Sequence, residues 1–213
     1  MKKVGMILII SALIIMSIPF IGNRYMQAKG DQIYTSYLQQ IEEQKQKNST
    51  LVNENLIQKP NDEDQEKEEV HYLFQQDEVM GRVKVPSIGV DVLLIEGEST
   101  KNLKLGVTHM LETAYPGEVG NCIIAGHRNY TFGSMFNRLG EVQLKDQISV
   151  EVRKLEYIYE VDDIEIINPG DLEILGQPRD ERRLTLLTCH PIHVGNKRLL
   201  IKAKLVSSLT KQE

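Results

Sequence analysis

A cysteine and an arginine near the end of the sequence occupy positions that suit chemistry. Cys189 follows Leu184–Thr188, an apolar and β-branched run typical of a short strand, and Arg198 begins a second strand-like segment, Arg198–Leu205. The stretch His190–Lys197 between them carries proline, glycine and asparagine, which predict a loop. A thiolate is a nucleophile that a nearby cation favours, and a guanidinium can hold a developing oxyanion. The ordinary alternative is a small buried cysteine beside a solvated arginine.

A histidine follows another apolar strand upstream. The segment Asn121–Gly126 is mostly apolar and ends in glycine, and His127 comes next. Histidine titrates near neutrality and is the most frequent general acid or base. Cysteine and histidine from distant parts of a chain form the nucleophile and base of many acyl-transfer enzymes. The spacing alone does not show that Cys189 and His127 meet.

The motifs around these residues resemble those of one family. Thr185-Leu-Leu-Thr-Cys189 with Arg198 after it resembles the TLxTC…R signature of the sortases, the cysteine transpeptidases of Gram-positive cell surfaces. Ala125-Gly-His127-Arg resembles the histidine strand of the same family. The similarity extends from Gly81 to Leu205 and includes, in order, Val83–Gly89, Glu96-Gly97, Leu105–His109 and Tyr115–Asn121. It implies an all-β domain, a closed barrel of about eight strands with short helices.

The resemblance also implies a role for each residue. Cys189 is the nucleophile that attacks the Thr–Gly amide of an LPXTG-like sorting signal, and His127 is the acid that protonates the leaving amine. Arg198 holds the substrate carbonyls and the oxyanion. Thr188 is expected to orient the substrate or to complete oxyanion donation, with a plain strand-forming role as its alternative. The expected partners are surface proteins that bear the signal, an amine of the peptidoglycan precursor or cross-bridge, and membrane lipid.

Composition and charge agree with one globular domain plus appendages. The chain has 213 residues, of which 41% are hydrophobic and 26% are charged, as is ordinary for a protein with a core. The net charge of -5 argues against the basic surface that nucleic-acid binding usually needs. The sequence has no tryptophan, so aromatic side chains on which bases could stack are few. We therefore expect no nucleic-acid partner.

The N-terminus predicts a membrane anchor. Val4–Gly22 contains no charged residue and is long enough to cross a bilayer core. Lys2 and Lys3 favour a cytoplasmic N-terminus with the rest of the chain outside the cell, although Arg24 reduces the asymmetry. A cleaved signal peptide is the alternative, but the apolar run exceeds the usual length and no small-x-small site follows. We expect residues 1–23 to be an uncleaved transmembrane helix in the cell membrane.

Residues 24–78 are expected to connect this anchor to the catalytic domain. Asp31–Ile57 has apolar residues at helical spacing, which suits a juxtamembrane helix or a weak self-association surface, but a solvated stalk is favoured. Pro60 ends the pattern, and Asn61–Glu69 is an acidic run that predicts an extended linker. The catalytic domain is expected over residues 79–208.

Within that domain, apolar runs between glycine and proline turns predict short strands. Besides the two segments near Cys189, the expected strands are Arg82–Pro86, Val90–Ile95, Cys122–Ala125, Asp146–Val152 and Glu156–Ile167. A helical turn is expected at Leu103–Gly106, a short helix at Phe132–Leu139, and a long loop at Asn168–Glu181. Many short strands of this kind predict a closed all-β domain.

No metal or other cofactor is expected. Three histidines lack a cysteine or carboxylate at typical zinc spacing: His109, His190 and His193. Loops that bind calcium in some relatives carry scattered carboxylates here, namely Glu112, Glu118, Asp171 and Glu173. The resemblance leaves calcium activation open, but carboxylates on loops are usually solvated, so calcium is not predicted.

The second cysteine is expected to remain unbridged. An extracellular protein with two cysteines invites a disulfide. However, Cys122 lies inside an apolar run, and Cys189 must stay free to act as a nucleophile. Arg128, which follows His127, is interpreted as a solvated charge.

Other functions remain open from the residues alone. One is a different cysteine acyltransferase or protease of the cell envelope, and another is a non-enzymatic, anchored adhesion module. The adhesion module would have no reason to carry cysteine, histidine and arginine at strand ends in this order. Within the family, pilin-polymerising sortases usually carry an N-terminal lid with an Asp-Pro-aromatic element and a second, C-terminal membrane segment. The sequence shows neither feature, which favours an anchoring enzyme of class A or class D.

Overall fold

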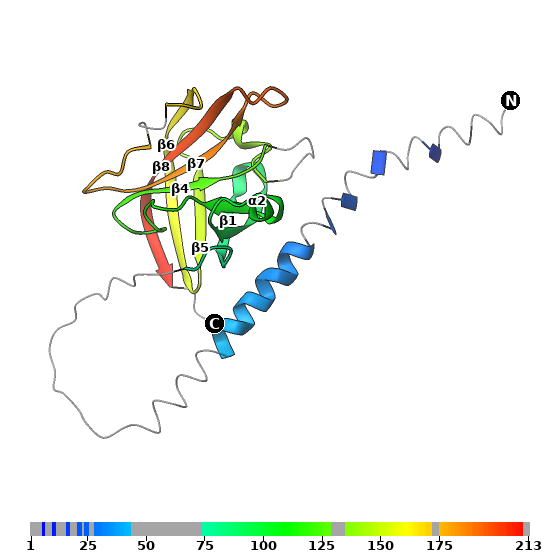
Figure 1. Ribbon diagram of the computed structural model, residues 1–213, viewed down its shortest axis with the longest axis horizontal. Helices are drawn as coiled ribbons and strands as arrows, with labels where there is room; N and C mark the ends of the chain where they lie inside the picture. Colours follow the sequence, from blue (N-terminus) through cyan, green and yellow to red (C-terminus); the bar gives the residue numbers. More distant parts are fainter. Residues whose placement is uncertain are drawn as a thin grey trace, which may run out of the picture.

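The fold is a closed β-barrel (Figure 1). The computed structural model describes residues 28–43, 74–128, 135–171 and 175–210, together with isolated helical residues between 6 and 25. Within these residues, the strands close in the order β1-β2-β3-β4-β7-β8-β6-β5. The expected all-β barrel of about eight strands is therefore confirmed.

The strands of the described residues follow the expected ranges closely. They are β1 (Val79–Val85), β2 (Val90–Glu96), β3 (Val107–His109), β4 (Gly120–Ala125), β5 (Gln147–Val152), β6 (Leu155–Ile167), β7 (Arg182–His190) and β8 (Lys197–Thr210). The short helical elements are η1 (Pro86–Ile88), α2 (Thr100–Leu105) and η2 (Leu139–Glu141). The sequence did not predict β3, because three residues are too few to show an alternation.

One expected helix is wrong in its described part. Phe132–Leu139 was expected to be helical, but residues 135–138 form turns, and only a 3-10 turn follows at η2. Met135 has a φ of 49°, outside the right-handed helical region, so a regular helix cannot pass through it. Residues 132–134 lie outside the described residues.

Alternation along the strands separates a barrel interior from an outer face. On β7, Leu184 and Leu186 are fully buried in the core, whereas Leu187 belongs to a separate apolar cluster on the outer face. On β8, Leu199 and Ile201 face the same interior. Cys189 shares the parity of Leu187, so the strand pattern directs it to the outer face.

A helix over residues 28–43 packs against the barrel at β1 and β5. Tyr37 is 7% exposed, and its hydroxyl donates to the backbone oxygen of Met80 at 2.9 Å. The hydroxyl of Tyr34 donates to a carboxylate oxygen of Glu151 at 3.4 Å. The preference for a solvated stalk is therefore wrong for this part, because aromatic side chains bury against the barrel. Since β1 and β7 are at opposite positions in the closed strand order, the helix lies across the barrel from β7.

The predicted anchor and acidic linker fall largely outside the described part of the chain. Most of Val4–Gly22 and all of Asn61–Glu69 are outside the described residues. None of the helices that the structure does describe combines the length and the apolar character that crossing a bilayer requires.

A buried ion pair joins β2 to β3. His109 Nδ1 lies 2.8 Å from a Glu96 carboxylate oxygen, and its Nε2 lies 3.1 Å from the Ala114 carbonyl oxygen. Both neighbours are acceptors, so the doubly protonated imidazolium satisfies both. Burial alone would lower the pKa of His109, but hydrogen bonds to Cys122 and Glu96 outweigh it and raise the pKa to about 10. The Tyr115 ring stacks on this imidazolium at 5.0 Å.

We expect this pair to make the stability of the fold depend on pH. The pKa of His109 rises from 6.5 to about 10 on folding, so its stabilisation is fully present below about pH 6.5 and is lost as the pH approaches 10. The free energy of unfolding, measured with urea at several pH values across this window, should therefore fall with pH. The double variant Glu96→Gln/His109→Gln replaces the ion pair with neutral amides and should show a smaller fall. Equal pH dependence in both proteins would contradict the assignment.

Candidate active site

The segment that carries His127 and the strand that carries Cys189 leave the barrel at the same edge. β4 and β7 are parallel, with Ala125 opposite Leu187, and the Gly126 amide donates to the Leu187 carbonyl at 3.0 Å. Continuing this register by two residues brings His127 level with Cys189. His127 is partly exposed there. The pairing therefore supplies the proximity that the sequence spacing could not show.

Arg198 lies directly across from the cysteine. β7 and β8 are antiparallel, and Cys189 pairs with Arg198, so both side chains project from the outer face. The guanidinium Nη1 donates to the carbonyl oxygens of Gly195 at 3.0 Å and Lys197 at 2.9 Å, which holds it against the β7–β8 loop. A Cβ added at Gly195 would lie 3.6 Å from the Cys189 Cβ, so this loop closes over the cysteine. The loop thus fixes the guanidinium of Arg198 on the strand next to Cys189, whose free thiol belongs to a partly buried residue.

Thr188 faces the opposite way. It is 1% exposed, and its hydroxyl donates to the Gly126 carbonyl at 2.7 Å. The hydroxyl that was expected to orient substrate is therefore occupied by a bond inside the protein. That bond ties the cysteine strand to the residue just before His127, so Thr188 positions the two strand ends.

Arg128 is a site residue that the sequence reasoning missed. Its Nη1 lies 2.8 Å from His190 Nδ1 and 3.4 Å from the carbonyl oxygen of Cys189. Its Nε donates to the Asn137 carbonyl at 3.3 Å. Burial lowers the pKa of Arg128, and the nearby Cys189 acts in the opposite direction. The sequence did offer one indication of this role, because Arg128 directly follows His127. A cation on the segment after β4 lies close to Cys189 once β4 and β7 pair.

The contact with Arg128 also determines the state of His190. A guanidinium can only donate, so His190 Nδ1 accepts and its proton is carried by Nε2. Burial, Arg128 and Lys197 all lower the pKa of His190. His190 is therefore a neutral ring whose role here is to anchor Arg128.

An apolar floor lies on the outer face next to the cysteine. Leu187 is two positions from Cys189 on the same face of β7, and it contacts a cluster formed by Ile123, Ile167, Leu175 and Leu200. Of these residues, only Leu187 is partly exposed, so it is the apolar contact that this group offers beside Cys189.

The two cysteines are both free thiols. Cys122 is 1% exposed and faces the barrel interior. It pairs with Leu184, which is five residues, or about 16 Å, from Cys189 along β7. A disulfide needs Cα atoms within about 7 Å, so the geometry excludes a bridge, as expected.

The candidate metal ligands are dispersed. His109 is buried with Glu96, His190 binds Arg128, and His193 lies in the β7–β8 loop. Glu118 accepts from the Tyr115 amide, and Asp171 accepts from Asn168. Over residues 74–128, 135–171 and 175–210, no three histidine, cysteine or carboxylate side chains come together in a way that could hold an ion; Glu173 is outside these ranges.

Comparison with known proteins agrees with this geometry. A family model of the sortase domain matches residues 83–206. The chain is also 30% identical over 150 residues to sortase D of Bacillus subtilis strain 168, which covers 69% of this chain and 74% of that relative. The chain belongs to the sortase family. It is 28% identical over 217 residues to sortase A of Listeria monocytogenes, covering 99% of this chain and 95% of the relative.

Solved sortase structures share the barrel. A crystal structure of Streptococcus agalactiae sortase C1 matches with a TM-score of 0.60 and 32% identity, covering 64% of this sortase and 72% of that chain. A lid mutant of sortase A from Corynebacterium diphtheriae matches with a TM-score of 0.59 and 29% identity, covering 62% and 73% respectively. Sortases are transpeptidases, so acyl transfer is the class of chemistry for this chain.

We expect Arg128 to be needed for turnover because it fixes the end of β7. Arg128→Gln removes the cation that bridges Cys189 O and His190, and should lower kcat about tenfold with little change in KM, or about 1.4 kcal/mol in the barrier. Arg128→Lys should lose a similar amount, because a single ammonium cannot also replace the Nε bond to the Asn137 carbonyl. Steady-state kinetics on a sorting-signal peptide measure this effect.

Arg138→Gln is the matched control. Arg138 is paired with Glu141 at the surface and donates to the Ile88 carbonyl, so its loss should change kcat less than about twofold. Melting curves of all three variants should overlap with that of the wild type. Full activity in Arg128→Gln would show that Arg128 has no role in positioning the nucleophile.

Proposed function

We propose that this sortase cleaves an LPXTG-like sorting signal between Thr and Gly and transfers the surface protein to a cell-wall amine. The supporting observation is the double pairing of β7, which sets Cys189 opposite Arg198 and brings the His127 segment to the same edge. The expected roles of His127, Cys189 and Arg198 as the catalytic residues are part of this proposal.

Acylation uses all three residues. The Cys189 thiolate attacks the Thr carbonyl carbon, and the negative charge that develops on the carbonyl oxygen is stabilised by Arg198. As the tetrahedral intermediate collapses, the C–N bond breaks and His127 donates a proton to the leaving glycine amine. The product of this step is a thioester between Cys189 and the threonine.

Transfer reverses the proton movement. An amine of the peptidoglycan precursor or cross-bridge attacks the thioester carbonyl, and the now neutral His127 takes a proton from it. Arg198 stabilises the second oxyanion as it did the first. The C–S bond breaks, Cys189 leaves as the thiolate, and the surface protein carries a new amide bond.

The surface next to the cysteine supports a signal with apolar residues. Leu187 is partly exposed on the outer face beside Cys189 and packs against the buried Ile123 and Leu200. A leucine or a proline upstream of the cleaved bond would bury its side chain against Leu187. Each buried apolar side chain stabilises binding by roughly 1.5–3 kcal/mol before the entropic cost of association.

Wall anchoring is favoured over pilin polymerisation. One solved structure similar to this chain is sortase C1 of GBS Pilus Island 1, with 32% identity, a TM-score of 0.59 and coverage of 63% of this chain and 67% of that one, so the pilin reaction stays the alternative. The lids of pilin-polymerising enzymes precede the barrel. In this chain, the helix over residues 28–43 packs on β1 and β5, across the barrel from Cys189. That helix therefore does not cover the nucleophile.

We also propose a single-pass membrane location, with the N-terminus in the cytoplasm and the barrel outside. It rests on the uncharged segment Val4–Gly22 preceded by Lys2 and Lys3. Protease added to intact protoplasts should then digest the barrel. Complete protection of the barrel until the membrane is lysed would contradict this orientation.

The central test of the function is a covalent adduct. Full-length protein in detergent micelles, mixed with LPXTG-like peptides, should give a thioester adduct that mass spectrometry maps to Cys189. Cys189→Ala should form none, whereas Cys122→Ser should keep most of its activity because Cys122 is buried and faces the interior. Adding an amine should release the adduct as a new amide. An adduct on Cys122, or none with any peptide, would overturn the proposal.

The same assay tests Arg198. Arg198→Lys keeps the charge but loses the planar fork that donates two parallel hydrogen bonds, so adduct formation should slow at least about tenfold. Near-wild-type rates in Arg198→Lys would remove Arg198 from the oxyanion role and leave Cys189 and His127 in place.

A further inference from the structure

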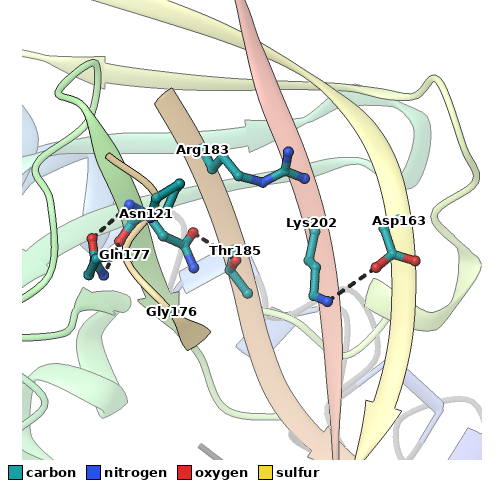
Figure 2. A pocket seen from close by; sticks show the side chains of 8 residues that line it. Asn121, Asp163, Gly176, Gln177, Arg183, Thr185 and Lys202 are labelled. Atoms are coloured by element: carbon teal, nitrogen blue, oxygen red, sulfur yellow. Dashed lines mark hydrogen bonds and ion pairs between the residues drawn. The ribbon is translucent and has the colours of Figure 1, made fainter. Parts of the chain in front are cut away.

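A polar cavity lies further along the same outer face as Cys189. Figure 2 shows it where β4, β7, β8 and β6 run side by side, with the β6–β7 loop at its rim. Its volume is about 450 Å³. The lining residues that matter here are Asn121, Asp163, Gln177, Arg183, Thr185 and Lys202.

The rim and floor of the cavity are held by specific hydrogen bonds. The Gln177 side chain accepts from the Asn121 amide at 2.8 Å and donates to the Asn121 carbonyl at 2.9 Å, which fixes the β6–β7 loop to β4 (Figure 2). The Thr185 hydroxyl donates to Asn121 Oδ1 at 2.9 Å, and both residues are buried. Asn121 Nδ2 makes none of the hydrogen bonds found among the described residues, so it can donate to a ligand.

The cations of the cavity are already neutralised. Lys202 Nζ binds Asp163 at 3.1 Å and Glu165 at 2.6 Å, and Arg183 is paired with carboxylates at 2.7 Å. A further negative charge on a ligand would therefore gain little and would face these carboxylates. An ammonium has three N–H groups, so Lys202 keeps one donor beyond its two carboxylates. The Asp163 oxygen that is not bonded to Lys202 remains an acceptor. The cavity therefore offers donors from Asn121 and Lys202 and an acceptor from Asp163. These groups complement a neutral amide, which both accepts and donates hydrogen bonds.

The distance from the nucleophile sets the register of any bound peptide. Thr185 is four residues before Cys189 on the same face of β7, or about 13 Å at roughly 3.3 Å per residue. Leu187 lies between them and is partly exposed, and Leu200, paired with it on β8, is buried. An extended peptide also spans about 13 Å over four residues. The order of surfaces from Cys189 is thus apolar and then polar.

The proposed substrate has the same order. Upstream of the cleaved bond it presents threonine, a variable residue, proline and leucine, and then the residue before the signal. We propose that the cavity is a subsite for that preceding residue and that it favours asparagine or glutamine there. The inference rests on the proposed cleavage of an LPXTG-like signal at Cys189, and it adds a specificity determinant outside the signal.

The test compares matched peptides with the full-length protein in detergent micelles. One is an acetylated LPXTG-like peptide that begins at leucine, and four others add asparagine, glutamine, leucine or glutamate before it. Asparagine and glutamine should lower KM about fivefold relative to leucine or glutamate at that position, with little change in kcat. Equal KM for all four extended peptides, or a preference for glutamate, would overturn the subsite.

Two cavity variants locate the effect. Lys202→Gln and Asn121→Leu should each bring the KM ratio of the leucine peptide to the asparagine peptide down to about one. The control is Lys101→Gln, which also replaces a lysine with glutamine but does so on the exposed face of α2. It should retain the fivefold ratio. If cavity variants instead raise the KM of the amine acceptor, the cavity binds that acceptor and the subsite is wrong.

The short peptide separates failure of the subsite from failure of the proposed cleavage. If it is cleaved but the added residue has no effect, only the subsite fails. If no peptide is cleaved by the wild type, the proposed function fails, and the subsite fails with it.

Discussion

The candidate active site depends on the hydrogen bonding of β7 to two neighbouring strands at once. β4 pairs with it in parallel, and β8 pairs with it antiparallel, so three segments far apart in the sequence meet at one edge. The register is decisive. A slip of one residue would turn Cys189 into the barrel interior and bring Thr188 to the outer face, because successive side chains point to opposite sides. The buried leucines of β7 oppose such a slip, so core packing and catalysis require the same register.

The inner and outer faces of β4, β7 and β8 serve different functions. Inward side chains fill the barrel, and outward ones form a surface that changes character with distance from Cys189. Arg198 lies opposite Cys189 on the next strand, the partly exposed Leu187 follows, and a polar cavity with neutralised charges lies beyond it. An extended peptide repeats every two residues, as a strand does, so such a surface can distinguish successive substrate positions.

Hydrogen bonds and one ion pair join the strands and strand ends around this edge. Arg128 bridges the His127 segment and the end of β7, and Thr188 joins the same two segments from inside. The buried His109–Glu96 pair joins neighbouring strands of the barrel. The helix over residues 28–43 binds the opposite side of the barrel through Tyr34 and Tyr37.

Local patterns in the sequence determined the strands, the closed all-β fold and the choice of Cys189 as candidate nucleophile, because alternation, turn residues and motifs are properties of neighbouring residues. The sequence also nominated His127 and Arg198, but it could not bring them together. Only the tertiary structure decided that Arg128 is a site residue and that Thr188 turns inward. Their partners are 61 or 62 positions away in the sequence, and the strand pairing that joins them leaves no mark in local composition.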